Sequence, residues 1–455
     1  MTPSLNDAFE KCVVRIGIFF DGTGKNGTAF DGSHEEMFKV SNIYRLFTYY
    51  GNPESEGGER ITGKVYIEGI GTLNNEPDSI YSLVTGDEDY WGCKGYGPDS
   101  KLQLCQKRVA SALGDILSQN NAACQEINIE FDIFGFSRGA VLARHLTNLI
   151  YESDVSVIDS IRNVLNKNGY ALSGTPVVNF LGLFDTVGAF MDSKAFYNDS
   201  HDTGYTRSLK VNVPAGAALH AFQFNAWHEF RYNFPLHSLG GHYPELTIAG
   251  AHSDVGGGYP LLEEERKVVS NRYIAPFDWA YGWVEKELFA TLGTHKWRAL
   301  TGRITYRGNK WFHYTATNER EVFGHLQFIA FIAMVKVAEK CGCIFSQDYK
   351  KFERIIPDDL VAYCERVLSA ALDALEGKST SLDEQNIDDI MRKYVHLSST
   401  WASVADMFGD MKKNAQMMRC RESNKDESKK EINLSVMNDF WPYRPHEGWQ
   451  RKIFD

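Results

Sequence analysis

One stretch decides the fold of this chain: Ile129-Glu130-Phe131-Asp132-Ile133-Phe134-Gly135-Phe136-Ser137-Arg138-Gly139-Ala140-Val141-Leu142-Ala143-Arg144. Its first half is a run of β-branched and aromatic residues of strand length, and its second half has the apolar face of a helix. Between them, Gly135-Phe136-Ser137-Arg138-Gly139 fits the pattern G-x-S-x-G. A serine on so tight a strand-to-helix turn is strained and holds its hydroxyl clear of the sheet. The stretch therefore predicts an α/β fold with Ser137 as a nucleophile; a structural turn serine is the alternative.

The residues around this serine suit the turn. Side chains two residues before and after Ser137 would crowd it, and glycine stands at both positions, Gly135 and Gly139. The helix begins just after the serine, so its N-terminus faces any oxyanion that forms there. We therefore expect the backbone N–H of Arg138 to be one oxyanion donor.

Composition narrows the class of protein. The chain has 455 residues, 43% of them apolar, and a formal net charge of -11. A net negative charge of this size argues against a protein that binds nucleic acid through electrostatic attraction. The eight cysteines are scattered without a C-x-x-C pair or zinc spacing. We expect no metal, no cofactor and a protein folded in a reducing cytosol, with no signal peptide and no membrane span.

The order of elements along the chain indicates a mostly parallel sheet with right-handed crossovers. The apolar runs predict the strands Val13–Phe20, Lys64–Gly71, the strand before Ser137, Val177–Phe184 and Glu245–Ala251. Periodic segments predict helices over Ser41–Tyr50 and Leu102–Leu117. The predicted fold is an α/β-hydrolase-like sheet flanked by helices, with a helical C-terminal region or insertion.

A glycine-rich loop follows the first strand, with the sequence Asp21-Gly22-Thr23-Gly24. In α/β-hydrolases one oxyanion donor comes from such an early loop and the other from the residue after the nucleophile. This gives Gly22 or Thr23, together with Arg138, as backbone donors. A phosphate or metal site that uses Asp21 and a plain turn are the competing interpretations.

Two further strands end in polar residues. Asp185 directly follows the strand Val177–Phe184, and His252 follows Glu245–Ala251. Because active sites in open α/β sheets lie beyond the carboxyl ends of strands, both are catalytic candidates. The chain order Ser137, Asp185, His252 is that of an α/β-hydrolase triad.

In this hypothesis His252 is the general base and Asp185 orients it. Asp254, two residues after the histidine, is the rival acid, and Asp21 is a further accessory candidate. Aspartates in glycine-rich loops also suit a cation. The structural alternatives are that Asp185 only caps a helix or lies in a loop, and that His252 is a buried structural histidine.

Three other segments support only structural expectations. The aromatic residues of Ala217–Phe234 lie at helical spacing and are expected in the core, with His228 and Glu229 in a polar network. The charged segment Leu261–Lys267 is expected to be exposed. Phe323–Glu339 is strongly apolar, so we expect a buried helix. The functional alternative is a lid that contacts the membrane.

Four blocks together resemble one known family. They are Phe19-Phe20-Asp21-Gly22-Thr23-Gly24-Lys25-Asn26, Gly135-Phe136-Ser137-Arg138-Gly139-Ala140, Phe184-Asp185-Thr186-Val187-Gly188 and His252-Ser253-Asp254-Val255-Gly256-Gly257-Gly258-Tyr259. They resemble the catalytic domain of the first family of type VI secretion lipase effectors, which are antibacterial phospholipases.

The resemblance implies an α/β-hydrolase domain over residues 10–290 with the triad Ser137, Asp185 and His252. It implies phospholipase A activity on membrane phospholipids of target cells, delivery into their periplasm by a secretion spike or tube protein, and a cognate immunity protein. Residues 291–455 are then an accessory region for a lid, membrane contact or docking. The family often has Asp-Glu-x-Arg where this chain has His228-Glu229-Phe230-Arg231.

Two other functions remain open from the residues alone. One is a cytosolic carboxylesterase acting on soluble esters. The other is a non-catalytic scaffold that keeps the hydrolase fold, although packing gives no reason for a serine, an aspartate and a histidine at three strand ends.

Overall fold

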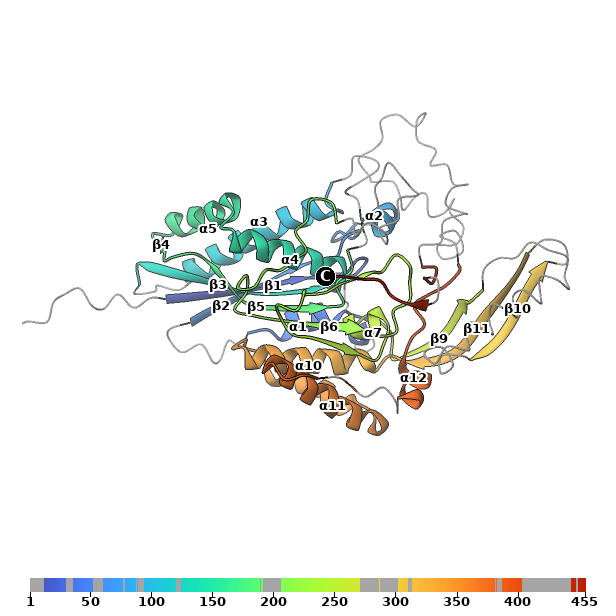
Figure 1. Cartoon of the computed structure of the whole chain (residues 1–455). Helices are drawn as coiled ribbons and strands as arrows, with labels where there is room; N and C mark the ends of the chain where they lie inside the picture. The colour runs from blue at the N-terminus through green and yellow to red at the C-terminus, as the bar shows by residue number, and fades with distance from the viewer. Residues whose placement is uncertain are drawn as a thin grey trace, which may run out of the picture.

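A parallel sheet forms the centre of the molecule (Figure 1). The computed structural model describes residues 12–29, 36–51, 60–119, 124–190, 206–270, 286, 302–402 and 443–455, except 77, 87, 89–93, 189, 310–312, 381, 383–386 and 447–448. Within these residues the sheet has seven strands in the order β2-β1-β3-β5-β6-β8, with β4 beside β3. Every pairing is parallel, which confirms the predicted fold class.

Strands and helices follow one another in mixed order along the chain. The central sheet contains β1 (Cys12–Phe20), β2 (Arg60–Ile67), β3 (Glu126–Phe136), β4 (Ala171–Leu172), β5 (Val177–Phe184), β6 (His220–Ala226) and β8 (Glu245–Ile248). The helices are α1 (Asn42–Tyr49), α2 (Ile80–Thr85), α3 (Pro98–Gln119), α4 (Arg138–Tyr151), α5 (Val155–Lys167), α7 (His252–Gly256), α10 (Leu326–Lys340), α11 (Asp358–Leu375) and α12 (Asp388–Tyr394). The predicted strand Val13–Phe20 and helix Ser41–Tyr50 are confirmed, and Ser41 caps α1.

Each face of the sheet is covered by its own set of helices. Helices α3, α4 and α5 lie on one face, and α1, α10 and α11 lie on the other (Figure 1). Neighbouring residues of one strand point to opposite faces: Phe20 packs in the aliphatic core under α3 and α4, and Phe19 stacks on Phe134 at 5.0 Å in the aromatic core beside α10. Burial on both faces explains why these strands are continuously apolar.

Helix α10 is a core helix. All ten of its residues from 326 to 335 are buried, and they contact α1, α7 and α11. A helix that is apolar all round is stable only when neighbours surround it. The buried-helix prediction is confirmed, and the membrane-touching lid is not supported for this segment. None of the helices in the described part of the chain has the length and apolarity needed to cross a bilayer.

Several boundaries and element types differ from the predictions. Strand β2 runs from Arg60 to Ile67 rather than from Lys64 to Gly71, and the helix α2 follows it in a segment for which no element was predicted. Within 217–234, residues 220–226 form β6 rather than a helix, because Phe222 and Phe224 share one face at strand spacing, 4.9 Å apart. Both phenylalanines are nevertheless in the core, as expected. The segment after β8 is the one-turn helix α7, which is too short to leave a periodic pattern.

The segment 261–267, expected to be exposed, is exposed at Leu262, Glu264 and Arg266, but it forms most of a strand in a second sheet and Glu265 is buried. Strands β9 (Leu262–Val268), β10 (Arg303–Asn309) and β11 (His313–Phe323) form an antiparallel sheet in the order β10-β11-β9. Glu265 is buried in this sheet, where it accepts hydrogen bonds from the Arg320 Nε at 2.8 Å and the Leu397 N–H at 2.6 Å. A neutralising partner 55 residues away allows the carboxylate to be buried.

The C-terminal end of the chain returns to the α/β body. The short strand β12 (Ile453–Phe454) pairs in parallel with β7 (Leu236–His237). In Figure 1 this red segment crosses beside the central sheet. The predicted boundary at residue 290 lies outside the described residues, so the division into two domains stays a prediction.

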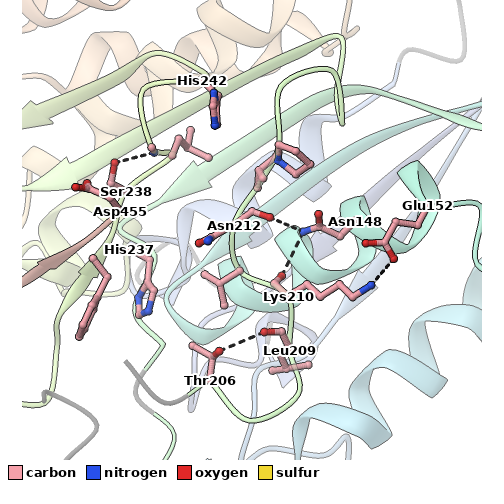
Figure 2. A pocket seen from close by; sticks show the side chains of 16 residues that line it. Asn148, Glu152, Thr206, Leu209, Lys210, Asn212, His237, Ser238, His242 and Asp455 are labelled. Atoms are coloured by element: carbon pink, nitrogen blue, oxygen red, sulfur yellow. Dashed lines mark hydrogen bonds and ion pairs between the residues drawn. The ribbon is translucent and has the colours of Figure 1, made fainter. Parts of the chain in front are cut away.

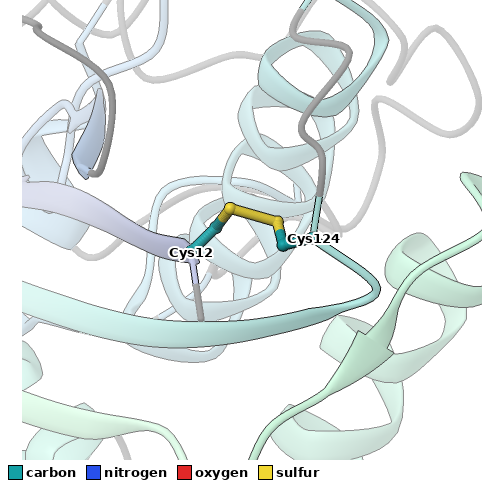
Figure 3. Close-up of a disulfide and its surroundings, with 2 residues drawn as sticks. All are labelled: Cys12 and Cys124. Atoms are coloured by element: carbon teal, nitrogen blue, oxygen red, sulfur yellow. A yellow bond between two sulfur atoms is a disulfide. The ribbon is translucent and has the colours of Figure 1, made fainter. Parts of the chain in front are cut away.

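A disulfide joins two neighbouring strands at their amino ends (Figure 3). Cys12 is the first residue of β1, and Cys124 lies two residues before β3, 112 residues along the chain. The expectation that the cysteines stay reduced is wrong for this pair. Their separation in sequence gives no hint of it, because only the pairing of β1 with β3 brings the two residues together.

This cross-link generates a stability prediction. We expect Cys12→Ser to lower the free energy of unfolding by about 2–4 kcal/mol under oxidising conditions, because the disulfide restricts the unfolded chain. Urea unfolding followed by circular dichroism, with and without dithiothreitol, measures the difference. Cys364→Ser removes a half-buried free cysteine and is the control. An equal loss of stability in Cys12→Ser with and without reductant would contradict a role for the cross-link.

Candidate functional site

Ser137 occupies a strained turn between β3 and α4. Its backbone has φ 57° and ψ −126°, a region that side-chain-bearing residues rarely adopt. The Ser137 N–H donates to the carbonyl of Phe184 at 3.1 Å, and its carbonyl accepts from the N–H of Val187 at 3.4 Å. These bonds connect the end of β3 to the end of β5. The serine therefore stands beside the segment that contains Asp185.

Two glycines make this turn possible, as the sequence predicts. A Cβ on Gly135 would lie 2.5 Å from the Cα of Ala140, and one on Gly139 would lie 2.3 Å from the carbonyl oxygen of Asp21. Both distances are far below a normal contact, and the obstacles are backbone atoms that cannot swing aside. The turn, the helix start and the end of β1 are thus in direct contact through glycine.

Asp185 and His252 meet above the sheet, although 67 residues separate them in sequence. The Asp185 Oδ2 lies 2.5 Å from the His252 Nδ1, and both side chains are almost completely buried. An ionised carboxylate can only accept a hydrogen bond, so Nδ1 has the proton and Nε2 is left with its lone pair. This is the tautomer that a general base requires.

Burial and charge set the pKa of both groups. Burial by itself would raise the pKa of Asp185, but the Arg451 guanidinium and the hydrogen bond with His252 hold it well below its ordinary value. Burial lowers the pKa of His252, and Asp185 only partly opposes this effect. At neutral pH the pair therefore consists of a carboxylate and a neutral imidazole.

A polar pair and two aromatic rings fix the position of His252. Its ring lies 4.6 Å from that of Phe136 and 5.2 Å from that of Phe234, measured between centroids. The backbone N–H of His252 donates to the Glu229 Oε2 at 3.3 Å, and the same carboxylate is paired with Arg231. Arg231 holds the pKa of the buried Glu229 at about 2 against the effect of burial. The polar network expected at Glu229 thus supports the histidine.

The rival acid, Asp254, has a different partner. Its Oδ1 lies 2.7 Å from the Nδ1 of His396, and its Oδ2 accepts from the N–H groups of His396 and Ala251 at 2.9 Å each. Asp254 therefore caps α7 and connects it to the segment after α12. Of the two candidate acids, the structure brings Asp185 to His252.

Arg451 is a site residue that the sequence analysis missed. Its Nη1 donates to the Asp185 Oδ1 at 2.6 Å and its Nη2 to the Asp185 Oδ2 at 2.9 Å. Because 266 residues separate the two partners in sequence, no local pattern signals this contact. Only the return of the C-terminal strand to β7 reveals it.

The glycine-rich loop after β1 lies against the serine turn. The Gly22 N–H donates to the Asp21 carboxylate at 2.7 Å, so this donor is already engaged. Asp21 is buried and also accepts from the Tyr66 hydroxyl at 2.6 Å, which makes it a structural residue of the loop. The Arg138 Nε donates to the Thr23 Oγ1 at 2.7 Å and fixes the loop to the start of α4. Thr23 and Arg138 thus remain the candidates for an oxyanion hole.

A separate cavity of about 840 Å³ lies where α4 meets the C-terminal strand (Figure 2). Figure 2 shows His237, Ser238 and Asp455 on one side of it and Asn148 and Lys210 on the other. Its lining contains no residue of the Ser137, Asp185 and His252 set. We therefore assign it no part in the chemistry.

Comparisons with known proteins bear on the family and on the fold. Residues 15–164 match the family model described as "T6SS, Phospholipase effector Tle1-like, catalytic domain". The matched range includes Ser137, whereas Asp185 and His252 lie beyond it. No curated protein matches this sequence significantly.

A solved structure has the same fold over nearly the whole chain. The Tle1 effector, determined bound to the VgrG spike of the type 6 secretion system, is 22% identical, with 98% of this chain and 94% of that chain covered at a TM-score of 0.72. The crystal structure of an uncharacterized protein from Pseudomonas aeruginosa is 16% identical, with 81% and 52% covered at a TM-score of 0.38.

The glycine contacts at the serine turn generate a prediction. We expect Gly139→Ala to lower the free energy of unfolding by about 1–3 kcal/mol, because the new methyl group has no space against the backbone of β1. Gly114→Ala, within α3 and with its nearest neighbour at 3.9 Å, is the matched control and should be neutral or slightly stabilising. Urea unfolding of both variants measures this, and a Gly139→Ala protein as stable as the native chain would disprove the close packing.

Proposed function

We propose that this chain, a Tle1-like phospholipase effector of the type VI secretion system, is a serine-dependent phospholipase A. The observation that carries the proposal is the position of Ser137 on a strained turn beside the buried Asp185–His252 pair. Three residue types that form a catalytic triad thus lie directly after β3, directly after β5 and at the start of α7, the helix that follows β8.

The chemistry follows from the protonation states. His252 Nε2 takes the proton of the Ser137 hydroxyl while Oγ attacks the carbonyl carbon of an acyl ester. The tetrahedral intermediate collapses when the bond to the glycerol oxygen breaks, and His252 returns the proton to that oxygen. Water then attacks the acyl-enzyme with His252 again as base, which releases the fatty acid and restores the serine hydroxyl. Asp185 stabilises the imidazolium in both halves.

The oxyanion of each tetrahedral intermediate needs donors that are already in place. We assign this role to the backbone N–H of Arg138, the first residue of α4, and to that of Thr23. First-turn N–H groups of a helix are suited to bind an anion. The hydrogen bond between the two side chains keeps these segments together.

The cellular setting follows from the type VI assignment. We propose glycerophospholipids of target-cell membranes as the substrate, with the periplasm of those cells as the place of action. A spike or tube protein would be the delivery partner, and a cognate immunity protein would block the site. A carboxylesterase acting on soluble esters is the alternative that uses the same triad.

The first test is release of fatty acid from phospholipid vesicles with labelled acyl chains. We expect the native chain to release label, and Ser137→Ala to be slower by at least roughly a thousandfold because the nucleophile is lost. Ser118→Ala, an exposed serine of α3, is the control. Intact vesicles together with hydrolysis of a short soluble ester would favour the carboxylesterase, and no cleavage of either would refute the enzyme assignment.

The pH profile gives a second test. His252 acts as a base only when it is neutral, and its pKa is lowered by burial. The rate therefore falls on the acid side only below the ordinary histidine pKa of about 6.5. Measurement of kcat/KM between about pH 4 and about pH 8, a window that contains the ordinary histidine pKa, checks this. An acid limb centred above 6.5 would contradict a buried, neutral base.

A further inference from the structure

The last residues of the chain are anchored beside the triad. The Leu236 N–H donates to the carbonyl of Lys452 at 2.9 Å, and the Ser238 N–H donates to that of Phe454 at 2.7 Å. These bonds form the β7–β12 pair, and Figure 2 shows Asp455 beside Ser238. Arg451, the residue before them, is therefore held by main-chain bonds at a fixed distance from the sheet.

The side chain of Arg451 is directed to the triad acid. The side chain is only 9% exposed, and its guanidinium binds both oxygens of Asp185, whose side chain has no exposure. Its Nε donates to the carbonyl of Phe234 at 2.7 Å, so the group is fixed from both ends. A planar fork that meets a carboxylate at two points sets orientation as well as charge.

We propose that Arg451 is a positioning residue of the hydrolase site, and that residues 449–455 complete the site by placing it there. This inference rests on the proposed function of Ser137, Asp185 and His252. Arg451 acts through Asp185, whose orientation determines where the imidazole of His252 stands. The catalytic unit thus includes the C-terminal end of the chain.

The strained backbone of Asp185 and the unfilled acceptor positions of its buried carboxylate explain why this residue needs such a partner. Asp185 has φ 43°, a conformation that costs energy in a residue with a side chain. Its Oδ1 accepts from the Ala226 N–H at 2.9 Å and its Oδ2 contacts His252, which leaves one further lone-pair direction on each oxygen. The Arg451 fork fills both. A buried carboxylate without this cation would be costly and free to rotate.

The positive charge of Arg451 also bears on the basicity of His252. Among the described residues, Asp185 and Glu229 raise the pKa of His252 and Arg231 lowers it. Arg451 pairs with the Asp185 carboxylate and so offsets the negative charge that favours the imidazolium. Loss of the charge at 451 leaves Asp185 with more influence on the imidazole, so the pKa of His252 rises. A positioning role therefore predicts two changes at once: a slower reaction and an acid limb at higher pH.

One other histidine faces the guanidinium and does not interfere. His237 on β7 is buried, and burial together with the charges of Arg144 and Arg451 lowers its pKa to about 3. It stays neutral over the working range. A shift of the acid limb above pH 5 thus reports on His252.

The experiment measures the rate at which a fluorophosphonate probe labels Ser137, as a function of pH, in the full chain. The probe needs an activated serine but no lipid, so the result does not depend on the substrate class. We expect Arg451→Gln to label roughly 10- to 100-fold more slowly, with the acid limb higher by about half a unit or more. Arg451→Lys should also be slower, because it loses the fork, but should keep the native acid limb. Arg162→Gln is the control, because it removes an exposed arginine of α5 that pairs with Asp159 and has no contact with the site.

Each outcome decides a separate point. Equal rates and acid limbs for Arg451→Gln and Arg162→Gln would overturn the positioning role while leaving the triad intact. Absence of labelling in the native chain would remove the proposed function and the inference with it. If Arg451→Gln does not fold, as judged by circular dichroism, Arg451→Lys decides: native rates overturn the proposal, and slower labelling with an unchanged limb supports it.

Discussion

The buried carboxylate of Asp185 is the interaction on which the site depends. Its two oxygens accept hydrogen bonds from β6, from His252, which is the first residue of α7, and twice from the C-terminal Arg451. The most distant of these partners, Arg451, is 266 residues from Asp185 in sequence. An ion with no solvent contact is stable only when all its acceptor positions are used. Burial of this one charge therefore requires the sheet, the histidine helix and the C-terminal strand to assemble together.

Backbone strain is concentrated at the same place. Ser137 and Asp185 both have positive φ, and both directly follow the ends of adjacent parallel strands. Glycine at 139 allows the helix start to touch the end of β1, which holds the serine turn from the other side. Rigid surroundings of this kind maintain strained residues at functional sites. The aromatic core around Phe134 and the apolar helix α10 provide that rigidity.

The accessory carboxylates have separate structural tasks. Asp254 pairs with His396 and Asp21 with Tyr66, and each of these pairs joins a site loop to a neighbouring element. Glu229 pairs with Arg231 in its own loop and accepts from the His252 N–H. An alternative triad acid was a reasonable interpretation of Asp254 because it lies two residues from His252. In a helical turn, however, its side chain turns back to cap its own helix instead of facing the imidazole.

Local pattern by itself determined the parallel α/β fold, the serine turn, and the placing of Asp185 and His252 after strands. These features depend on the periodicity of neighbouring residues and on glycines that permit one conformation, so a single sequence contains them. Tertiary structure alone decided that His252 pairs with Asp185 rather than leaving Asp254 as its acid, that residues 220–226 form a strand, and that Cys12 joins Cys124. It alone placed Arg451 on the carboxylate. The physical reason is that these contacts join residues distant in sequence, and their geometry is set by strand order and by the path of the chain end.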